Sequence, residues 1–197
     1  MFTAAILAGG QARRFGGKPK GLLSIGNKRI IDHQIEILRM VTDQIGIVTT
    51  DLKNYETLGL PFWEDLIPGA GPLGGIYTAL NHSKTSETLI VASDMPFLDR
   101  KFLQYLAKIS NQGFDVTILR STDGQQPLCA CYNQRCTEII KKKIEERALK
   151  VTDFLSEVTI REIGPKEIKL FDPEDKLFFN VNSLDDYNHC LKLMNNQ

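Results

Sequence analysis

Short apolar runs alternate with segments of helical periodicity along most of this chain. The runs "FTAAIL", "QIGIVTT" and "ETLIVASDM" are typical of buried strands, and the segments 29–40, 74–83 and 99–110 are typical of helices. Such alternation favours an α/β fold, a Rossmann-like three-layer α/β/α sandwich with a mainly parallel sheet. In such sheets a ligand binds at the carboxyl ends of the strands, so the loops that follow the strands are where a site is expected.

The second half of the chain continues the pattern with shorter elements. Residues 115–121 and 126–133 are predicted strands on either side of a turn at Asp123-Gly124, and 136–149 and 151–158 are predicted helices. Residues 178–182, "FFNVN", are predicted as a short strand, and 183–194 as a closing helix capped by Ser183. Without repeats or a linker, residues 1–197 are expected to form a single domain.

The charge balance limits the partners that the chain could bind. Lysine plus arginine is 24 and aspartate plus glutamate is 24, which argues against broad nucleic-acid or anionic-membrane binding. The four cysteines form no Cys-x-x-Cys pair and are expected to be reduced and buried. The first apolar run is too short for a secretory signal, and no run approaches the roughly 20 apolar residues of a membrane helix. We therefore expect a cytoplasmic protein.

The loop after the first predicted strand combines glycines with basic residues. Its sequence is "LAGGQARRFGGKPKGLL", residues 7–23. Glycines let successive backbone N–H groups form a concave anion site, and Arg14 and Lys20 could reach a polyphosphate. The alternative is a solvated loop with incidental cations. It is not a Walker-type phosphate loop, because Pro19 stands where that motif needs Ser or Thr.

A second glycine pattern, "GAGPLG" at 69–74, matches the dinucleotide fingerprint only weakly. The preceding segment "PFWEDLIP" carries two acids and two prolines and is a poor central strand. We therefore do not expect a dinucleotide site there, although such a loop can contact a base or ribose through its backbone.

Polar side chains near the predicted strand ends are candidates for a metal or ligand site. Asp94 follows an apolar strand, and a carboxylate there suits Mg²⁺ shared with phosphates, although it could instead cap a turn. Asp65 follows the same logic more weakly, on the same side of an extended segment as Trp63, and could equally be a surface acid. Asn180 and Asn182 share one face of the predicted late strand and could bind metal or ligand, or serve a strand end and helix cap.

Taken together, these motifs resemble those of the molybdenum cofactor guanylyltransferases, a family of nucleotidyltransferases. The matching pieces are "LAGGQARRFGGKPKGLL", "WEDLIPGAGPLGGI", "ASDMPF", "QQPL" and "FFNVNS". They occur in family order and span nearly the whole chain. The resemblance implies the nucleotide-diphospho-sugar transferase type of the α/β sandwich, with Mg²⁺ as cofactor.

The resemblance also implies substrates and an activity. GMP would pass from GTP to the phosphate of molybdopterin, with release of pyrophosphate and formation of the guanine dinucleotide cofactor. The product could be handed transiently to a molybdoenzyme or a cofactor-insertion protein, and neither nucleic acid nor membrane is implied as a partner.

The site residues are carried over from the matching motifs. Arg14, Lys20 and Asp94 would be catalytic, and Asp94 would also bind the metal. The nucleotide would contact Leu7, Ala8, Gly9, Gly10, Lys20, Thr49, Asp65 and Asp94. Asn180, Asn182 and Lys150 would lie on the metal or pterin side.

Two departures from the family pattern concern the base that the site accepts. Thr49 stands where some members have an asparagine near the ribose. Lys18-Pro19-Lys20 is closer to the sugar-nucleotide branch. A cytidylyl- or sugar-phosphate nucleotidyltransferase of the same fold is therefore an alternative. A nucleotide-binding carrier that releases no pyrophosphate is a separate alternative.

Overall fold

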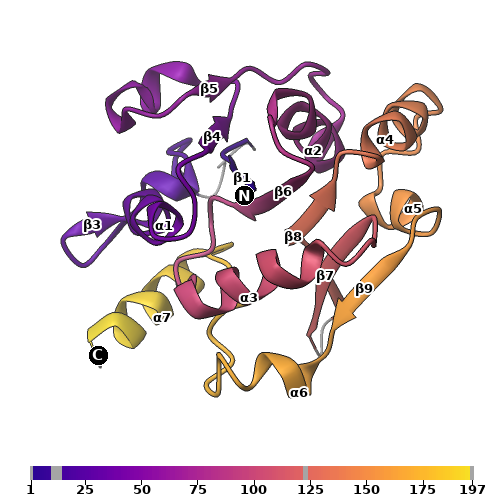
Figure 1. Ribbon diagram of the computed structural model, residues 1–197. Coiled ribbons are helices and arrows are strands. Elements are labelled where there is room, and N and C mark those ends of the chain that lie inside the picture. The colour runs from indigo at the N-terminus through magenta and orange to yellow at the C-terminus, as the bar shows by residue number, and fades with distance from the viewer. Residues whose placement is uncertain (1, 10–14, 122–123, 196–197) are drawn as a thin grey trace.

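A seven-stranded sheet forms the centre of the computed structural model, which describes residues 2–9, 15–121 and 124–195 (Figure 1). The strand order is β5-β4-β1-β6-β8-β7-β9. Their bounds are β1 Thr3–Leu7, β4 Ile45–Val48, β5 Phe62–Trp63, β6 Glu87–Ala92, β7 Val116–Ser121, β8 Gly124–Asn133 and β9 Ile160–Ile163. Within this sheet β8 is antiparallel to β6 and β7, whereas the other pairings are parallel. The prediction of a mainly parallel sheet is confirmed.

Helices cover both faces of the sheet and make it the middle of three layers (Figure 1). One apolar core joins the sheet to α1 (Ile30–Arg39), α3 (Arg100–Ser110) and α6 (Pro165–Ile168). The other core joins it to α2 (Gly71–His82), α4 (Cys136–Glu145) and α5 (Val151–Leu155). Strand β1 is buried on both sides, as expected for a central strand.

A smaller unit packs beside these layers and includes the end of the chain. It consists of the hairpin β2 (Ser24–Ile25) and β3 (Lys28–Arg29) and of helix α7 (Leu184–Asn195). A third apolar cluster holds them together through Ile25, Val181 and Cys190. Tyr187 also donates a hydrogen bond of 2.6 Å to the carbonyl oxygen of Ser24. Single-turn 3-10 helices η2 (Lys20–Leu22), η3 (Leu52–Asn54) and η4 (Glu56–Leu58) complete the elements.

Three predicted elements differ from the structure. The segment 178–182 is irregular and not a strand. Its backbone N–H groups form hydrogen bonds with a turn and with another loop; for example, Val181 N donates to Asp94 O at 2.9 Å. The helices predicted at 136–149 and 151–158 end earlier, at Glu145 and Leu155. Strand β9 was not predicted, because its sequence "IREI" is short and half polar. It is an edge strand that pairs only with β7.

Two further predictions concerned the four cysteines and membrane-spanning segments. Cys129, Cys131, Cys136 and Cys190 are free and buried, as predicted, and burial raises the pKa of the Cys129 thiol to about 12. Within the described ranges, no helix has the length and apolarity needed to cross a membrane.

Close packing against the edge strand β5 requires glycine at position 46. A Cβ built on Gly46 of β4 would lie 2.3 Å from Cζ2 of Trp63, well inside van der Waals contact. The indole ring also stacks on the ring of His82, with the centroids 5.4 Å apart. Moving the indole to make room for a Cβ would disturb this stacking.

We predict that Gly46→Ala lowers the free energy of unfolding by about 1–3 kcal/mol through overpacking. Thermal unfolding followed by circular dichroism measures this loss. Gly164→Ala is the matched control, because a Cβ at Gly164 meets nothing within 4 Å. Equal melting temperatures for the two variants would contradict the packing argument.

Candidate active site

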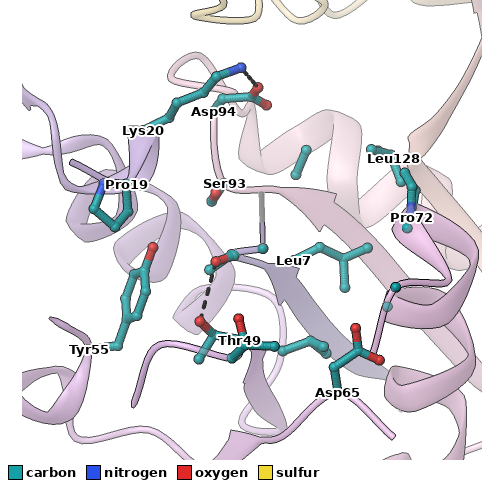
Figure 2. A pocket seen from close by; sticks show the side chains of 18 residues that line it. Leu7, Pro19, Lys20, Thr49, Tyr55, Asp65, Pro72, Ser93, Asp94 and Leu128 are labelled. Carbon is teal, nitrogen blue, oxygen red and sulfur yellow. Dashed lines mark hydrogen bonds and ion pairs between the residues drawn. The ribbon is translucent and has the colours of Figure 1, made fainter. Parts of the chain in front are cut away.

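A cavity of about 610 Å³ lies at the carboxyl ends of β1, β4 and β6 (Figure 2). Residues 7–9 and 19–20 line it from the first loop, 48–50 from the end of β4, and 92–94 from the end of β6. Asp65 and the start of α2 close another side. The position is the one expected for a ligand site in an α/β sheet.

The floor of the cavity is fixed by backbone hydrogen bonds that continue the parallel ladder. Ala8 N donates to Val48 O at 2.9 Å, and Ser93 N donates to Leu7 O at 3.1 Å. The backbone after β1 is thereby held between the loops that follow β4 and β6. Three segments far apart in the sequence meet at one edge of the sheet.

A lysine and a carboxylate form a polar cluster at one end of the cavity, and the amide of Asn182, which does not line the cavity, contacts the lysine. Lys20 Nζ lies 2.9 Å from Asp94 Oδ2 and donates to Asn182 Oδ1 at 2.6 Å. The side chains of Lys20 and Asp94 are 26% and 18% exposed, so water screens the pair only in part. Figure 2 shows the Lys20–Asp94 pair at one end of the cavity and Asp65 at the other.

Thr49 lines the cavity, but its hydroxyl already has partners. Its Oγ1 donates to Ala8 O at 3.3 Å and accepts from Asp51 N at 3.0 Å, and the residue is 1% exposed. The side chain therefore orients the Ala8 carbonyl, and contact with a ligand at this position would come from the backbone.

Asp65 has one oxygen engaged in local structure. Oδ1 accepts from Ile67 N at 3.1 Å and from Thr78 Oγ1 at 3.3 Å. Oδ2 has no hydrogen bond from the residues that the structure describes. The loop thus orients the carboxylate and leaves an acceptor at the cavity wall.

Not every residue predicted for the site is brought to the cavity. Asn180 donates from Nδ2 to Phe178 O at 3.0 Å, and Lys150 is exposed just before α5; neither lines the cavity. Gly10 and Arg14 lie outside the described residues. Trp63 lines a different cavity, with His82 and Lys84, although Trp63 and Asp65 both contact α2, through His82 and Thr78 respectively.

Sequence reasoning missed Tyr55, which lines the cavity from the end of η3. The residue is 0% exposed, and burial raises the pKa of its hydroxyl to about 12. The hydroxyl has no hydrogen-bond partner among the described residues. A lone aromatic residue within "DLKNYETL" carries no signal beyond a packing role.

The fold and this cavity define an α/β protein with a ligand site at the carboxyl ends of its parallel strands, and comparison with known proteins narrows this class. The model of the MobA-like NTP transferase domain matches residues 4–158. A probable molybdenum cofactor guanylyltransferase of Clostridium perfringens is 34% identical over 96% of each chain. One of Carboxydothermus hydrogenoformans is 32% identical over 97% of this chain and 95% of its own.

Solved structures agree with these matches. Molybdopterin-guanine dinucleotide biosynthesis protein A from Archaeoglobus fulgidus has a TM-score of 0.86, with 27% identity over 100% of both chains. A putative glucose-1-phosphate thymidylyltransferase from Bacillus anthracis, at 15% identity and covering 98% of this chain and 95% of its own, shares the fold with a TM-score of 0.70. The chain belongs to the MobA-like family of nucleotidyltransferases. The resemblance drawn from the sequence and the predicted fold class are both confirmed.

The unpartnered hydroxyl of Tyr55 leads to a stability prediction. A buried polar group without a partner costs about 1–3 kcal/mol, so Tyr55→Phe should raise the free energy of unfolding by about 1 kcal/mol. For a chain of this size that corresponds to roughly 2–4 °C in melting temperature.

Tyr132→Phe is the matched control. Tyr132 is also 0% exposed, but its hydroxyl donates to Pro127 O at 2.7 Å. Its loss should lower stability by about 0.5–1.5 kcal/mol. If both variants lose stability equally, Tyr55 is hydrogen-bonded after all.

Proposed function

We propose that the chain transfers GMP from GTP to the terminal phosphate of molybdopterin and releases pyrophosphate. The observation that carries this proposal is the Lys20 ammonium beside Asp94 at the edge of the cavity, 2.9 Å from the carboxylate. The names of the relatives support the substrates, since those from Clostridium perfringens and Carboxydothermus hydrogenoformans are called guanylyltransferases. We also infer that residues 1–197 act as a single domain.

The two ends of the cavity suit the two ends of a nucleotide. We infer that the triphosphate lies toward Lys20, with the backbone of Leu7, Ala8 and Gly9 along it, and that Gly10 and Arg14 contribute from the same loop. The guanine base would lie toward Asp65. Guanine presents N–H donors, and the free Oδ2 of Asp65 is an acceptor of the kind that they require.

The residues at Asp94 fit a divalent metal ion, with Mg²⁺ as the proposed cofactor. Asp94 offers the hard carboxylate oxygens that Mg²⁺ prefers, and it shares Oδ2 with the Lys20 ammonium. The described residues contain no group of three metal-binding side chains, so phosphate and water would have to supply most of the ligands. When bound, the ion would neutralise phosphate charge.

The transfer requires positioning more than acid–base chemistry. An oxygen of the molybdopterin phosphate bonds to the α-phosphorus of GTP, and the bond from that phosphorus to the bridging oxygen of pyrophosphate breaks. The attacking oxygen is already anionic, so no strong base is needed. His33, His82 and His189 accordingly lie elsewhere: none lines this cavity. Lys20 stabilises the negative charge that moves onto the leaving group.

A second group of residues concerns the acceptor, molybdopterin. Asn180, Asn182 and Lys150 remain our proposal for the pterin side, with Asn182 supported by its contact with Lys20. Handover of the product to a molybdoenzyme or to a cofactor-insertion protein is part of the same proposal.

A cytidylyl- or sugar-phosphate nucleotidyltransferase is the second candidate. The sequence Lys18-Pro19-Lys20 favours it, and the structural relatives include a 4-diphosphocytidyl-2C-methyl-D-erythritol synthase from Anaerococcus prevotii with a TM-score of 0.70 at 10% identity over 99% of this chain and 96% of its own. That likeness concerns the fold alone. The base that the cavity accepts separates the two candidates.

The deciding experiment measures pyrophosphate release with molybdopterin and Mg²⁺ in the presence of GTP, CTP, ATP or UTP. We expect release with GTP and, for the other three, less than about a hundredth of that rate, because a site built on paired hydrogen bonds rejects a mismatched base strongly. Release with CTP alone would establish the second candidate. Calorimetric titration with all four nucleotides, if silent, would exclude both.

Replacing Lys20 should affect the reaction far more than replacing its neighbour. Lys20→Met keeps the length of the side chain and removes its charge. We expect kcat/KM to fall about 10- to 150-fold, because this factor corresponds to the free energy of one hydrogen bond to a charged group. Lys18→Met is the matched control, since Lys18 is exposed and does not line the cavity. Comparable losses in both variants would indicate a general charge effect and remove Lys20 from the site.

A further inference from the structure

The last segment of the chain returns to the active site. Val181 N donates to Asp94 O at 2.9 Å, which joins the segment before α7 to the loop that follows β6. One residue later, Asn182 Oδ1 accepts from Lys20 Nζ at 2.6 Å. This segment lies beyond the residues 4–158 that the family model matches.

The backbone of Asn182 is held by the first turn of α7. Asp186 Oδ2 accepts from Asn182 N at 2.9 Å and from Ser183 N at 2.8 Å. In return, Asp186 N donates to Ser183 Oγ at 3.1 Å. These bonds form a reciprocal capping box, and they confirm Ser183 as the helix cap. The carboxylate thereby also fixes the residue that precedes the cap.

A carboxylate suits this position because a single oxygen receives two N–H groups. The two bonds are 2.9 and 2.8 Å long, and hydrogen bonds to a carboxylate are about twice as strong as those to a neutral acceptor.

The contact with Asn182 limits how Lys20 can move. A lysine side chain carries about 2 kcal/mol of rotamer entropy when free. With two of its three N–H donors held by Asp94 and Asn182, the ammonium has one donor left for a phosphate oxygen. The arrangement orients the charge before a nucleotide binds.

We propose that Asp186 is a positioning residue for nucleotidyl transfer, which holds Asn182 so that its amide oxygen keeps the Lys20 ammonium beside Asp94. This inference rests on the proposed function for its kinetic consequence. Its structural consequence does not depend on any reaction.

The kinetic test compares Asp186→Ala with Ser183→Ala. Both variants lose half of the capping box and should lose similar stability, about 1 kcal/mol. Only Asp186→Ala frees Asn182, so kcat/KM should fall about tenfold in that variant and stay within about twofold in Ser183→Ala. Asp186→Glu, which keeps a carboxylate in the capping box, should recover most of the activity. Equal losses in both alanine variants would reduce Asp186 to a helix cap.

A second comparison separates positioning from general destabilisation. In a Lys20→Met background, Asp186→Ala should lower kcat/KM by less than about twofold, because residues that act through one another are not additive. A further tenfold loss in the double variant would contradict the proposal.

The structural test uses crystal structures of Asp186→Ala and Ser183→Ala without nucleotide. We expect the hydrogen bond between Lys20 Nζ and Asn182 Oδ1 to be lost in the first and kept in the second. If it persists in Asp186→Ala, the inference is overturned whether or not the protein turns over GTP. If it is lost but the wild-type protein releases no pyrophosphate, the proposed function fails and the positioning of Lys20 stands.

Discussion

The backbone ladder around β1 is the constraint on which the rest of the site depends. Hydrogen bonds from Ala8 N to Val48 O and from Ser93 N to Leu7 O extend the ladder beyond the last residue of β1 on both sides. Because the three strands are parallel, their following loops open at the same edge. The sheet therefore fixes where the cavity lies, and the loops that follow its strands supply most of the walls.

The charges of the site are arranged around this fixed edge with few side chains. Lys20 comes from η2, Asp94 from the loop after β6, and Asn182 from the segment before α7. A partly buried lysine paired with a carboxylate is screened less by salt than a surface pair. The ammonium is thus held in a defined place, which favours a role in stabilising charge on a polyphosphate over a role in proton transfer.

Much of the fold could be predicted because its signals are local. The runs around β1, β4 and β6 are apolar and bounded by polar loops, and α1 and α3 have clear helical periodicity. Asp65 and Asp94, which line the cavity, could be named because they follow predicted extended segments, and Lys20 because it lies in the glycine-rich loop after the first strand. Strand β9 could not, since its four residues depend on pairing with β7 and not on their own propensity.

Contacts made across long stretches of chain were beyond the reach of sequence patterns. The alternation in "FFNVN" is compatible with a strand, yet this segment bonds to the Asp94 loop, and that choice is made by tertiary structure. Likewise, nothing in "VTT" indicates that the Thr49 hydroxyl would be used on the Ala8 carbonyl. The hydroxyl of Tyr55 was missed for the same reason, because its environment consists of residues distant in sequence.

The hydrogen bond between Lys20 and Asn182 has a consequence for the order of folding, because it joins residues 162 positions apart in the sequence. Closing a loop of that length before the elements between its ends have packed costs chain entropy. The pairing of β1 with β4 and β6 spans shorter stretches of chain and brings these elements together. We therefore expect refolding to form the cavity before it restrains Lys20.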